Sequence, residues 1–541
     1  MRGTNERLPY GVGQITPGWL LLVSLAAVVF VSGLQAYLQQ LREGLVVTGL
    51  RDIGTMGGAP WGLYVAFDVY FVGVSFAGIT VAALIRLLNL KQLKPLSRMA
   101  ELLTIIALLL AAMAILADLG QPLRGLLNLP RYARPQSPFF GTFTLVVAGY
   151  LFASLIYFFL DGRRDAAICA RIPSPLQGFH RLWASGYQGT PEEQERHHRT
   201  SFWLAIAIVP LLITAHSTLG FVFGLQVGRP GWYSALQAPA FVVMAGISGL
   251  GLLVILAAIF RRALRAYEAL NPEVFQWLGR FLFILIAIYL YFTVVEVLTG
   301  MYTGGQYERR VMETLLFGDY APIYWFSILC LGVSFALLAF QVLSQRWWIS
   351  LLVLSGVLVN LAAVGKRFLI VVPSQTHGML LPYGLGSYVP SPVEVRIILG
   401  LIGLGTLLYA VFAKVFPIME VEAPEEAIPW QARMVFSMPS RRALSPRTVV
   451  AIAMVVAGFA IQALAYFFFA APWGFPPRSP VYSNPRVVLV PTTVVAFAEP
   501  RARALALALS ILGSPPTLFI LGVILVFLAA VVYELWPQKR S

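Results

Sequence analysis

Apolar runs of about twenty residues recur from one end of the chain to the other, and they limit what it can fold into. A helix of about 20 residues crosses the roughly 30 Å of hydrocarbon in a bilayer, where helices keep every backbone group paired. The runs lie at residues 19–41, 61–88, 102–117, 139–160, 201–223, 235–260, 277–300, 322–343, 347–372, 393–416, 449–470 and 518–536. We therefore predict an all-α integral membrane protein with about twelve transmembrane helices.

Basic residues are distributed unevenly between the loops that join these runs. Dense clusters occur at 86–98, 163–199, 261–265 and 441–447, which fall on alternate loops. Because cytoplasmic loops are enriched in lysine and arginine, we place this set, and with it both termini, in the cytoplasm. The net charge of +15 is then explained by basic residues at the cytoplasmic surface of the membrane, next to lipids, and does not indicate a nucleic-acid-binding protein.

Few residues in the chain could hold a metal cofactor. Two cysteines, Cys169 and Cys330, fall short of the roughly four thiolates of an iron–sulfur cluster. Only one of the five histidines, His216, lies in an apolar run, so we expect no haem. The pair His197 and His198 sits in a polar stretch that we expect to be a solvated loop, with no metal site.

Ionisable residues do occur within the runs or at their ends: Asp68, Asp118, His216, Glu296, Lys366 and Arg367. An aspartate at the centre of a membrane helix costs roughly 2.5 to 3.5 kcal/mol, so such residues usually have a function. With the orientation above, all six fall in the outer half of the membrane. They predict an outward-facing polar pocket, with Tyr64, Tyr233 and Tyr302 at a similar depth.

A structural explanation for these charges also stays open. Asp118 could pair with Arg124, and Glu296 could pair with Lys366 or Arg367, as packing salt bridges. Asp68 could likewise have only a structural role.

A faint internal repeat suggests how the runs are grouped. "APWGLYVAFDVYFVG" opens the second run and "APAFVVMAGISGLG" the sixth, which favours two four-helix bundles, runs 2–5 and 6–9. The expected parts are 1–60 (N-terminal span and outer loop), 61–225 and 226–373 (the bundles), 374–448 (tenth span and cytoplasmic segment) and 449–541 (a C-terminal two-helix extension). Secondary transporters also contain repeated bundles, so a proton- or ion-coupled transporter is an alternative function, and a pure membrane anchor is a third.

Several stretches together resemble the NrfD family of polysulfide-reductase-type membrane subunits. They are "PWGLYVAFDVYFVGVSFAG", "ADLGQPLR", "AHST" followed by "PGWYSALQAPAFV", and "KRFLIVVPS" leading to "VRIILGLIGLGTLLYAVFAKVFPIMEV". The resemblance covers roughly residues 15–422 and is closest to the longer ten-span kind found in hydrogenase-linked and alternative complex III assemblies. The last two runs lie beyond it, and for them we expect a docking surface or a lipid-filling pair of helices.

The resemblance implies a haem-free respiratory subunit in the cytoplasmic (inner) membrane of a bacterium or archaeon. Such a subunit binds menaquinone or another quinone near the outer face and exchanges electrons with a ferredoxin-like iron–sulfur partner there. That partner serves a molybdopterin-type or cytochrome-containing catalytic subunit, and some members are thought to translocate protons. The chain itself would carry no separate catalytic domain.

The resemblance also implies which residues act. Asp118, Arg124, His216 and Trp232 match family positions around the quinone, and Asp68 and Glu296 match intramembrane acids of the two bundles. With the residues of similar depth added, the expected quinone-binding set is Asp118, Arg124, His216, Trp232, Tyr233 and Tyr64, and the expected proton-transfer set is Asp68, Asp118, His216, Glu296, Lys366 and Arg367. Quinone chemistry moves two electrons and two protons, so a histidine and carboxyls can carry protons while an arginine stabilises negative charge. Tyr233 stands where similar long members often have histidine, and tyrosine is a poorer proton carrier near neutral pH.

Overall fold

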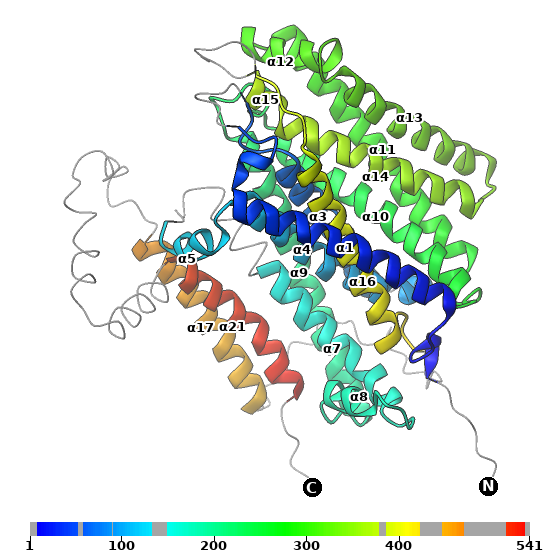
Figure 1. Ribbon diagram of the computed structural model, residues 1–541. Helices are drawn as coiled ribbons and strands as arrows, with labels where there is room; N and C mark the ends of the chain where they lie inside the picture. The colour runs from blue at the N-terminus through cyan, green and yellow to red at the C-terminus, as the bar shows by residue number, and fades with distance from the viewer. Residues whose placement is uncertain are drawn as a thin grey trace.

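The computed structural model describes residues 8–51, 58–88, 90–132, 149–377, 386–421, 446–469 and 515–535. Within these ranges the regular secondary structure is helical and contains no strand (Figure 1). The prediction of an all-α integral membrane protein is confirmed.

Nine helices in the described ranges are long and apolar enough to cross a membrane. They are α1 (Pro17–Glu43), α3 (Leu63–Leu87), α4 (Lys94–Asp118), α9 (Pro191–Gly224), α10 (Gln237–Ala263), α11 (Pro272–Leu298), α13 (Ala321–Ser344), α14 (Ile349–Val371) and α16 (Pro392–Val415). The other three predicted runs meet α7 (Leu151–Cys169), α17 (Pro446–Phe469) and α21 (Pro515–Leu535). Residues 139–148, 470 and 536 of those runs lie outside the described ranges.

The helices group as the internal repeat suggested. In the first bundle, α3 packs on α4 and α9, and α7 packs on α4 and α9. In the second bundle, α10 packs on α11 and α14, and α13 packs on the same two helices. Contacts of α3 with α10 and α14 join the two bundles, and α1 and α16 lie side by side against the first one (Figure 1).

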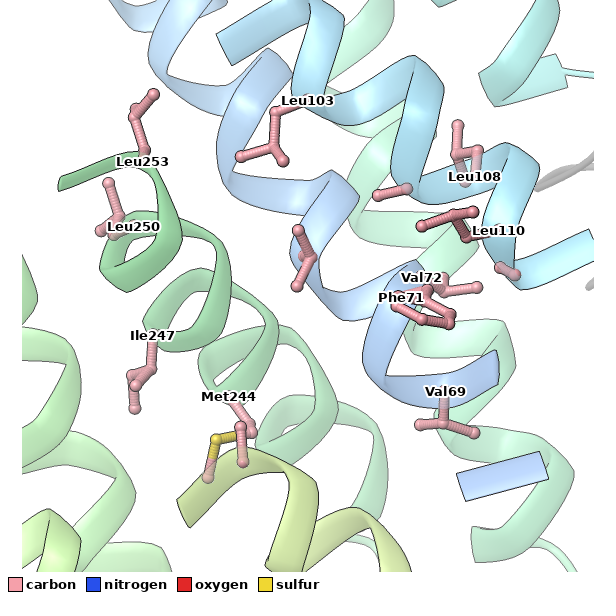
Figure 2. Close-up of a cluster of buried hydrophobic side chains, with 14 of the residues drawn as sticks. Val69, Phe71, Val72, Leu103, Leu108, Leu110, Met244, Ile247, Leu250 and Leu253 are labelled. Carbon is pink, nitrogen blue, oxygen red and sulfur yellow. The ribbon is translucent and has the colours of Figure 1, made fainter. Parts of the chain in front are cut away.

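The core between the bundles is built from apolar side chains of three helices (Figure 2). It includes Val69, Phe71 and Val72 from α3, Leu103, Leu108 and Leu110 from α4, and Met244, Ile247, Leu250 and Leu253 from α10. On α10 these four residues recur at every third position, so the apolar stripe winds around the helix along its contact with α3. This packing holds α3, and therefore Asp68, between the two bundles.

Glycines let two helix pairs approach unusually closely. A Cβ atom added at Gly33 of α1 would come within 2.5 Å of the Cα of Gly400 in α16. A Cβ at Gly458 of α17 would come within 2.6 Å of the carbonyl oxygen of Gly522 in α21. Small residues at such crossings allow close backbone packing where helix association has little help from the hydrophobic effect.

A buried ion cluster marks one end of the first bundle, which we call the Arg98 face. The guanidinium of Arg98, 1% exposed, pairs with Asp165 and lies 3.4 Å from Asp161 of α7. The backbone N–H of Val421 also donates to Asp165 at 3.0 Å, so the cluster fixes the segment that follows α16. The opposite end, where α3 begins beside Trp61, is called the Trp61 face.

The C-terminal extension docks on the first bundle through charged groups. Helix α21 packs against α7 and α9, and its Glu534 carboxylate lies 2.8 Å from Arg163 and 3.1 Å from the ring of His197. The expectation of a solvated loop at His197 is therefore wrong: α9 begins at Pro191, and this turn of the helix faces α21. His198, the next residue, is exposed.

Candidate functional site

Polar side chains from three helices meet at the Trp61 face. Tyr64 and Asp68 lie four residues apart on α3, which puts them on the same side of the helix. The Tyr64 hydroxyl donates to the side-chain oxygen of Gln40 in α1, and the Gln40 amide donates to the carbonyl of Ala117 at 2.7 Å. Tyr64 and Gln40 are both buried, so this chain of hydrogen bonds ties α1 and α3 to the end of α4, where Asp118 lies.

Of the two aspartates of this cluster, Asp68 is buried and Asp118 is partly buried, and both carboxyls lack hydrogen-bond partners in the described residues. Asp68 is 9% exposed and makes no hydrogen bond or ion pair within the described part of the chain. Asp118 has a buried carboxyl oxygen, Oδ1, without a partner in the same ranges, and the two carboxyls are close enough to interact electrostatically. Because buried polar atoms are normally hydrogen-bonded, an unpartnered pair is a candidate functional group.

Glu394 and Tyr388 complete this cluster, and they were not predicted. The Glu394 carboxylate is fully buried and accepts from the backbone N–H of Gly49 at 2.6 Å and of Ser391 at 2.8 Å, while the Tyr388 hydroxyl donates to its other oxygen. Tyr388 in turn accepts from the N–H of Leu63 at 2.8 Å. Burial and the Glu394 charge raise the pKa of Tyr388, so it stays a hydroxyl donor at neutral pH.

One sequence signal could have led to Glu394. Ser391 and Glu394 form a capping box at the start of α16, and the S-x-x-E pattern before an apolar run is visible in "SPVE". The pattern gives a helix start but not the contact with Gly49, which is 345 positions away in sequence. We call Gln40, Tyr64, Asp68, Asp118, Tyr388 and Glu394 the Tyr64 cluster.

Arg124 does not join the Tyr64 cluster. It lies on the short helix α5 (Pro122–Tyr132), is exposed, and forms no ion pair with Asp118 in the described residues. Gly120 has a φ of +61°, which turns the chain sharply between α4 and α5 and carries Arg124 outward. The packing salt bridge that was one explanation for Asp118 is therefore not formed.

His216 is buried inside the first bundle. Its Nε2 lies 2.9 Å from the carbonyl of Val72 and its Nδ1 lies 2.9 Å from the carbonyl of Leu212. Val72 follows Asp68 by one turn of α3, and the ring of Phe76 contacts the imidazole edge-on at a centroid distance of 4.8 Å. Both ring nitrogens thus face backbone carbonyls, and the histidine contacts α3 one turn further along the helix than Asp68.

A second group of predicted residues lies in the second bundle. The Lys366 ammonium is 3.3 Å from the Glu296 carboxylate, and it lies 5.3 Å from the ring centroid of Tyr324. The indole of Trp232 donates to the carbonyl of Ile370 at 2.6 Å. Glu296, Lys366 and Trp232 line one cleft, which we call the Lys366 cleft.

Arg367 points away from this cleft, because consecutive residues on a helix are about 100° apart. Its guanidinium lies 4.2 Å above the ring of Phe241 and donates to the carbonyl of the same residue at 3.3 Å. Tyr233 and Tyr302 are 52% and 90% exposed at the surface. The predicted residues thus form two separate groups, the Tyr64 cluster and the Lys366 cleft, instead of the single pocket expected from sequence. Arg367 and His216 are buried and make their contacts outside both groups.

Three similar proteins are named as parts of oxidoreductases. A putative dimethyl sulfoxide reductase membrane subunit from Halobacterium salinarum is 28% identical over 445 residues, covering 78% of this chain and 97% of its own length. A selenate reductase subunit from Mesobacillus selenatarsenatis is 25% identical, covering 74% of this chain and 94% of its own. An Hdr-like menaquinol oxidoreductase integral membrane subunit from Archaeoglobus fulgidus is 24% identical, covering 76% and 96%.

The family described as polysulphide reductase, NrfD, matches residues 51–377, a range that begins just before α3 and ends just after α14. This range contains both four-helix bundles, whereas Tyr388, Glu394 and the C-terminal extension lie beyond it. The match covers more than half of the chain, and the chain belongs to the NrfD family.

Proposed function

We propose that this chain is the quinone-binding membrane subunit of a respiratory oxidoreductase complex, and that it exchanges electrons between menaquinone and a partner iron–sulfur subunit. The observation that carries the proposal is the pair of unpartnered carboxyls, buried Asp68 and partly buried Asp118 with its buried Oδ1, held beside the Tyr64 hydroxyl. Quinone chemistry needs groups that hold and release protons near the ring. The donor set of the Tyr64 cluster fits this need.

A bound quinone supplies the electron carrier, and the residues of this chain handle the protons. Oδ1 of Asp118 is the buried atom that can take up a proton, because no protein donor in the described ranges occupies it. Tyr64 and Gln40 hold the end of α4 in place around that atom. Asp68 interacts electrostatically with Asp118 and precedes Val72, whose carbonyl contacts His216, by one turn of α3, which suits a relay into the bundle.

The relatives support the partners that we assign. One is named as a membrane subunit of a dimethyl sulfoxide reductase, one as a subunit of a selenate reductase, and one as part of a menaquinol oxidoreductase. We infer a ferredoxin-like iron–sulfur subunit at the Trp61 face and, beyond it, a molybdopterin-type or cytochrome-containing catalytic subunit. We also infer that the Trp61 face is the outer side of the cytoplasmic membrane, because the basic loops lie at the other end.

Photoaffinity labelling of the purified complex tests the proposal. An azido-quinone should label peptides of α3 and α4 around Asp68 and Asp118, and excess menaquinone should compete with the label. The matched control is Asp319→Asn, which removes a carboxylate from a loop at the Trp61 face, while Asp118→Asn should weaken labelling. Labelling elsewhere in the complex, unchanged by Asp118→Asn, would refute the assignment of the quinone to this cluster.

A further inference from the structure

The short helix α15 (Pro373–Thr376) carries three buried polar side chains, two of which have clear structural partners. Gln375 exchanges hydrogen bonds with the backbone of Trp61, accepting at 3.1 Å and donating at 2.9 Å. The hydroxyl of Thr376 lies 2.8 Å from that of Tyr320. Ser374 is equally buried, at 2% exposed, yet its hydroxyl has no partner within the described residues.

Ser374 lies on the wall of the Lys366 cleft, together with Glu296, Lys366 and Trp232. The cleft has about 20 Å³ of room, which is enough for a single water molecule. A quinone ring does not fit in that space. The cleft therefore suits a small polar ligand and is distinct from the Tyr64 cluster.

The chemistry of the wall matches the needs of one water molecule. A bound water is stable when two to four polar groups surround it. The ammonium of Lys366 donates, the carboxylate of Glu296 accepts, and the Ser374 hydroxyl can do either. Glu296 is 36% exposed while Lys366 is 4% exposed, so the ion pair runs from the surface to the interior along this cleft.

We propose that the Lys366 cleft binds exchangeable water, and that Ser374 is the residue that connects the buried Lys366 end of the Lys366–Glu296 pair to the aqueous phase at the Trp61 face. The step is a proton transfer alone: a proton that reaches the Lys366–Glu296 pair is held on the Glu296 carboxyl, passes to the cleft water and from there to bulk water, and the pair returns to ammonium and carboxylate. No electron moves. The second bundle thus has its own proton outlet, separate from Asp118. The proposal rests on the proposed function only for the quinone turnover that drives proton exchange.

Two variants of equal shape test the role of the hydroxyl. Ser374→Thr keeps a hydroxyl and Ser374→Val replaces it with a methyl group, so the pair differs in polarity but not in size. Ser334→Ala is the control, because the Ser334 hydroxyl is buried in α13 and donates to the carbonyl of Cys330 at 2.8 Å. All variants are studied in the intact complex.

The first measurement is X-ray footprinting, in which bound water generates hydroxyl radicals that label the nearest side chains. Trp232 should be labelled rapidly in the wild type and in Ser374→Thr, and slowly in Ser374→Val. The second is proton release from proteoliposomes during quinol oxidation. The two protons of each quinol leave through the Tyr64 cluster in every variant, whereas release beyond these two should slow by about a hundredfold in Ser374→Val, the lower end for loss of a positioned proton-transfer group. Ser334→Ala should match the wild type in both.

Each outcome decides one claim. If Ser374→Val and Ser374→Thr behave alike in footprinting and in proton release, the hydroxyl is not the connecting group and the inference is overturned. If the wild-type complex oxidises no quinol, the proposed function fails, while footprinting still tests the water site by itself. Unchanged quinol oxidation in Ser374→Val, with loss of only the protons released beyond two per quinol, supports both.

Discussion

The buried carboxylate of Glu394 gives the sharpest prediction about stability. It is fully buried and accepts three hydrogen bonds, from the N–H groups of Gly49 and Ser391 and from the hydroxyl of Tyr388. Bonds to a charged group contribute about 1.5 to 3 kcal/mol each, and neutral ones about 0.5 to 1.5. Glu394→Gln weakens the three bonds and should lower the free energy of unfolding by about 3 kcal/mol.

Two further substitutions at this site complete a graded series. Glu394→Ala removes all three bonds and should cost about 6 kcal/mol. Tyr388→Phe removes two, the bond donated to Glu394 and the bond accepted from Leu63, and should cost about 3 kcal/mol. The control is Glu313→Gln, because Glu313 forms an exposed pair with Arg309 at 3.1 Å and should change stability by less than about 0.5 kcal/mol.

Unfolding in detergent can be followed with a thiol-reactive fluorescent dye. Cys169 and Cys330 are free thiols and both are buried, so the dye reacts only as the helices separate. The transition should move to lower denaturant in Tyr388→Phe and in Glu394→Gln, and furthest in Glu394→Ala. A Glu394→Ala protein as stable as Glu313→Gln would refute the hydrogen-bond assignment and the link between α16 and the Tyr64 cluster.

Three more predictions concern the rest of the molecule. Arg98→Leu leaves two buried aspartates without their cation, so the same dye assay should show a loss of about 3 to 5 kcal/mol; an unchanged transition would contradict the buried pairing. Glu534→Gln should weaken the contact of α21 with Arg163, and backbone hydrogen exchange in α21 should become faster. Exchange as slow as in the wild type would contradict this prediction. Burial lowers the pKa of His377, which lies near Asp319 and Arg310. As the pH falls, His377 is therefore protonated in the unfolded chain at a higher pH than in the folded protein. Stability should therefore decline below about pH 6.5, and His377→Asn should flatten that decline; equal pH dependence of both proteins would contradict it.

The sequence predicted the helices well because the bilayer imposes a length and a composition on each of them. Every predicted run meets a helix, and the two bundles follow the order of the internal repeat. Boundaries were less predictable where polar residues continue a helix beyond the hydrocarbon. Helix α9 begins at Pro191 with the capping residue Thr190, ten residues before the apolar run, and this places His197 against Glu534.

The candidate site was predictable in its residue types but not in its grouping. Hydropathy identifies Asp68, Asp118 and Glu296 as acidic residues whose insertion into the membrane costs free energy. Their position along a helix, however, does not tell which neighbouring helix each side chain faces. The α14 helix shows the difficulty, since Lys366 and Arg367 are neighbours in sequence and face different helices. Glu394 was missed because its partners Gly49 and Tyr388 come from loops whose approach depends on the whole fold.

The most direct test of the central claim is quinol oxidation by the complete purified complex with Asp118→Asn. Asparagine keeps the shape of the side chain and cannot exchange a proton, so turnover should fall by about a hundredfold or more while the complex stays assembled. The matched variant Asp319→Asn should keep wild-type turnover. Full quinol oxidation by Asp118→Asn would show that protons do not pass through the Tyr64 cluster, and would contradict the account.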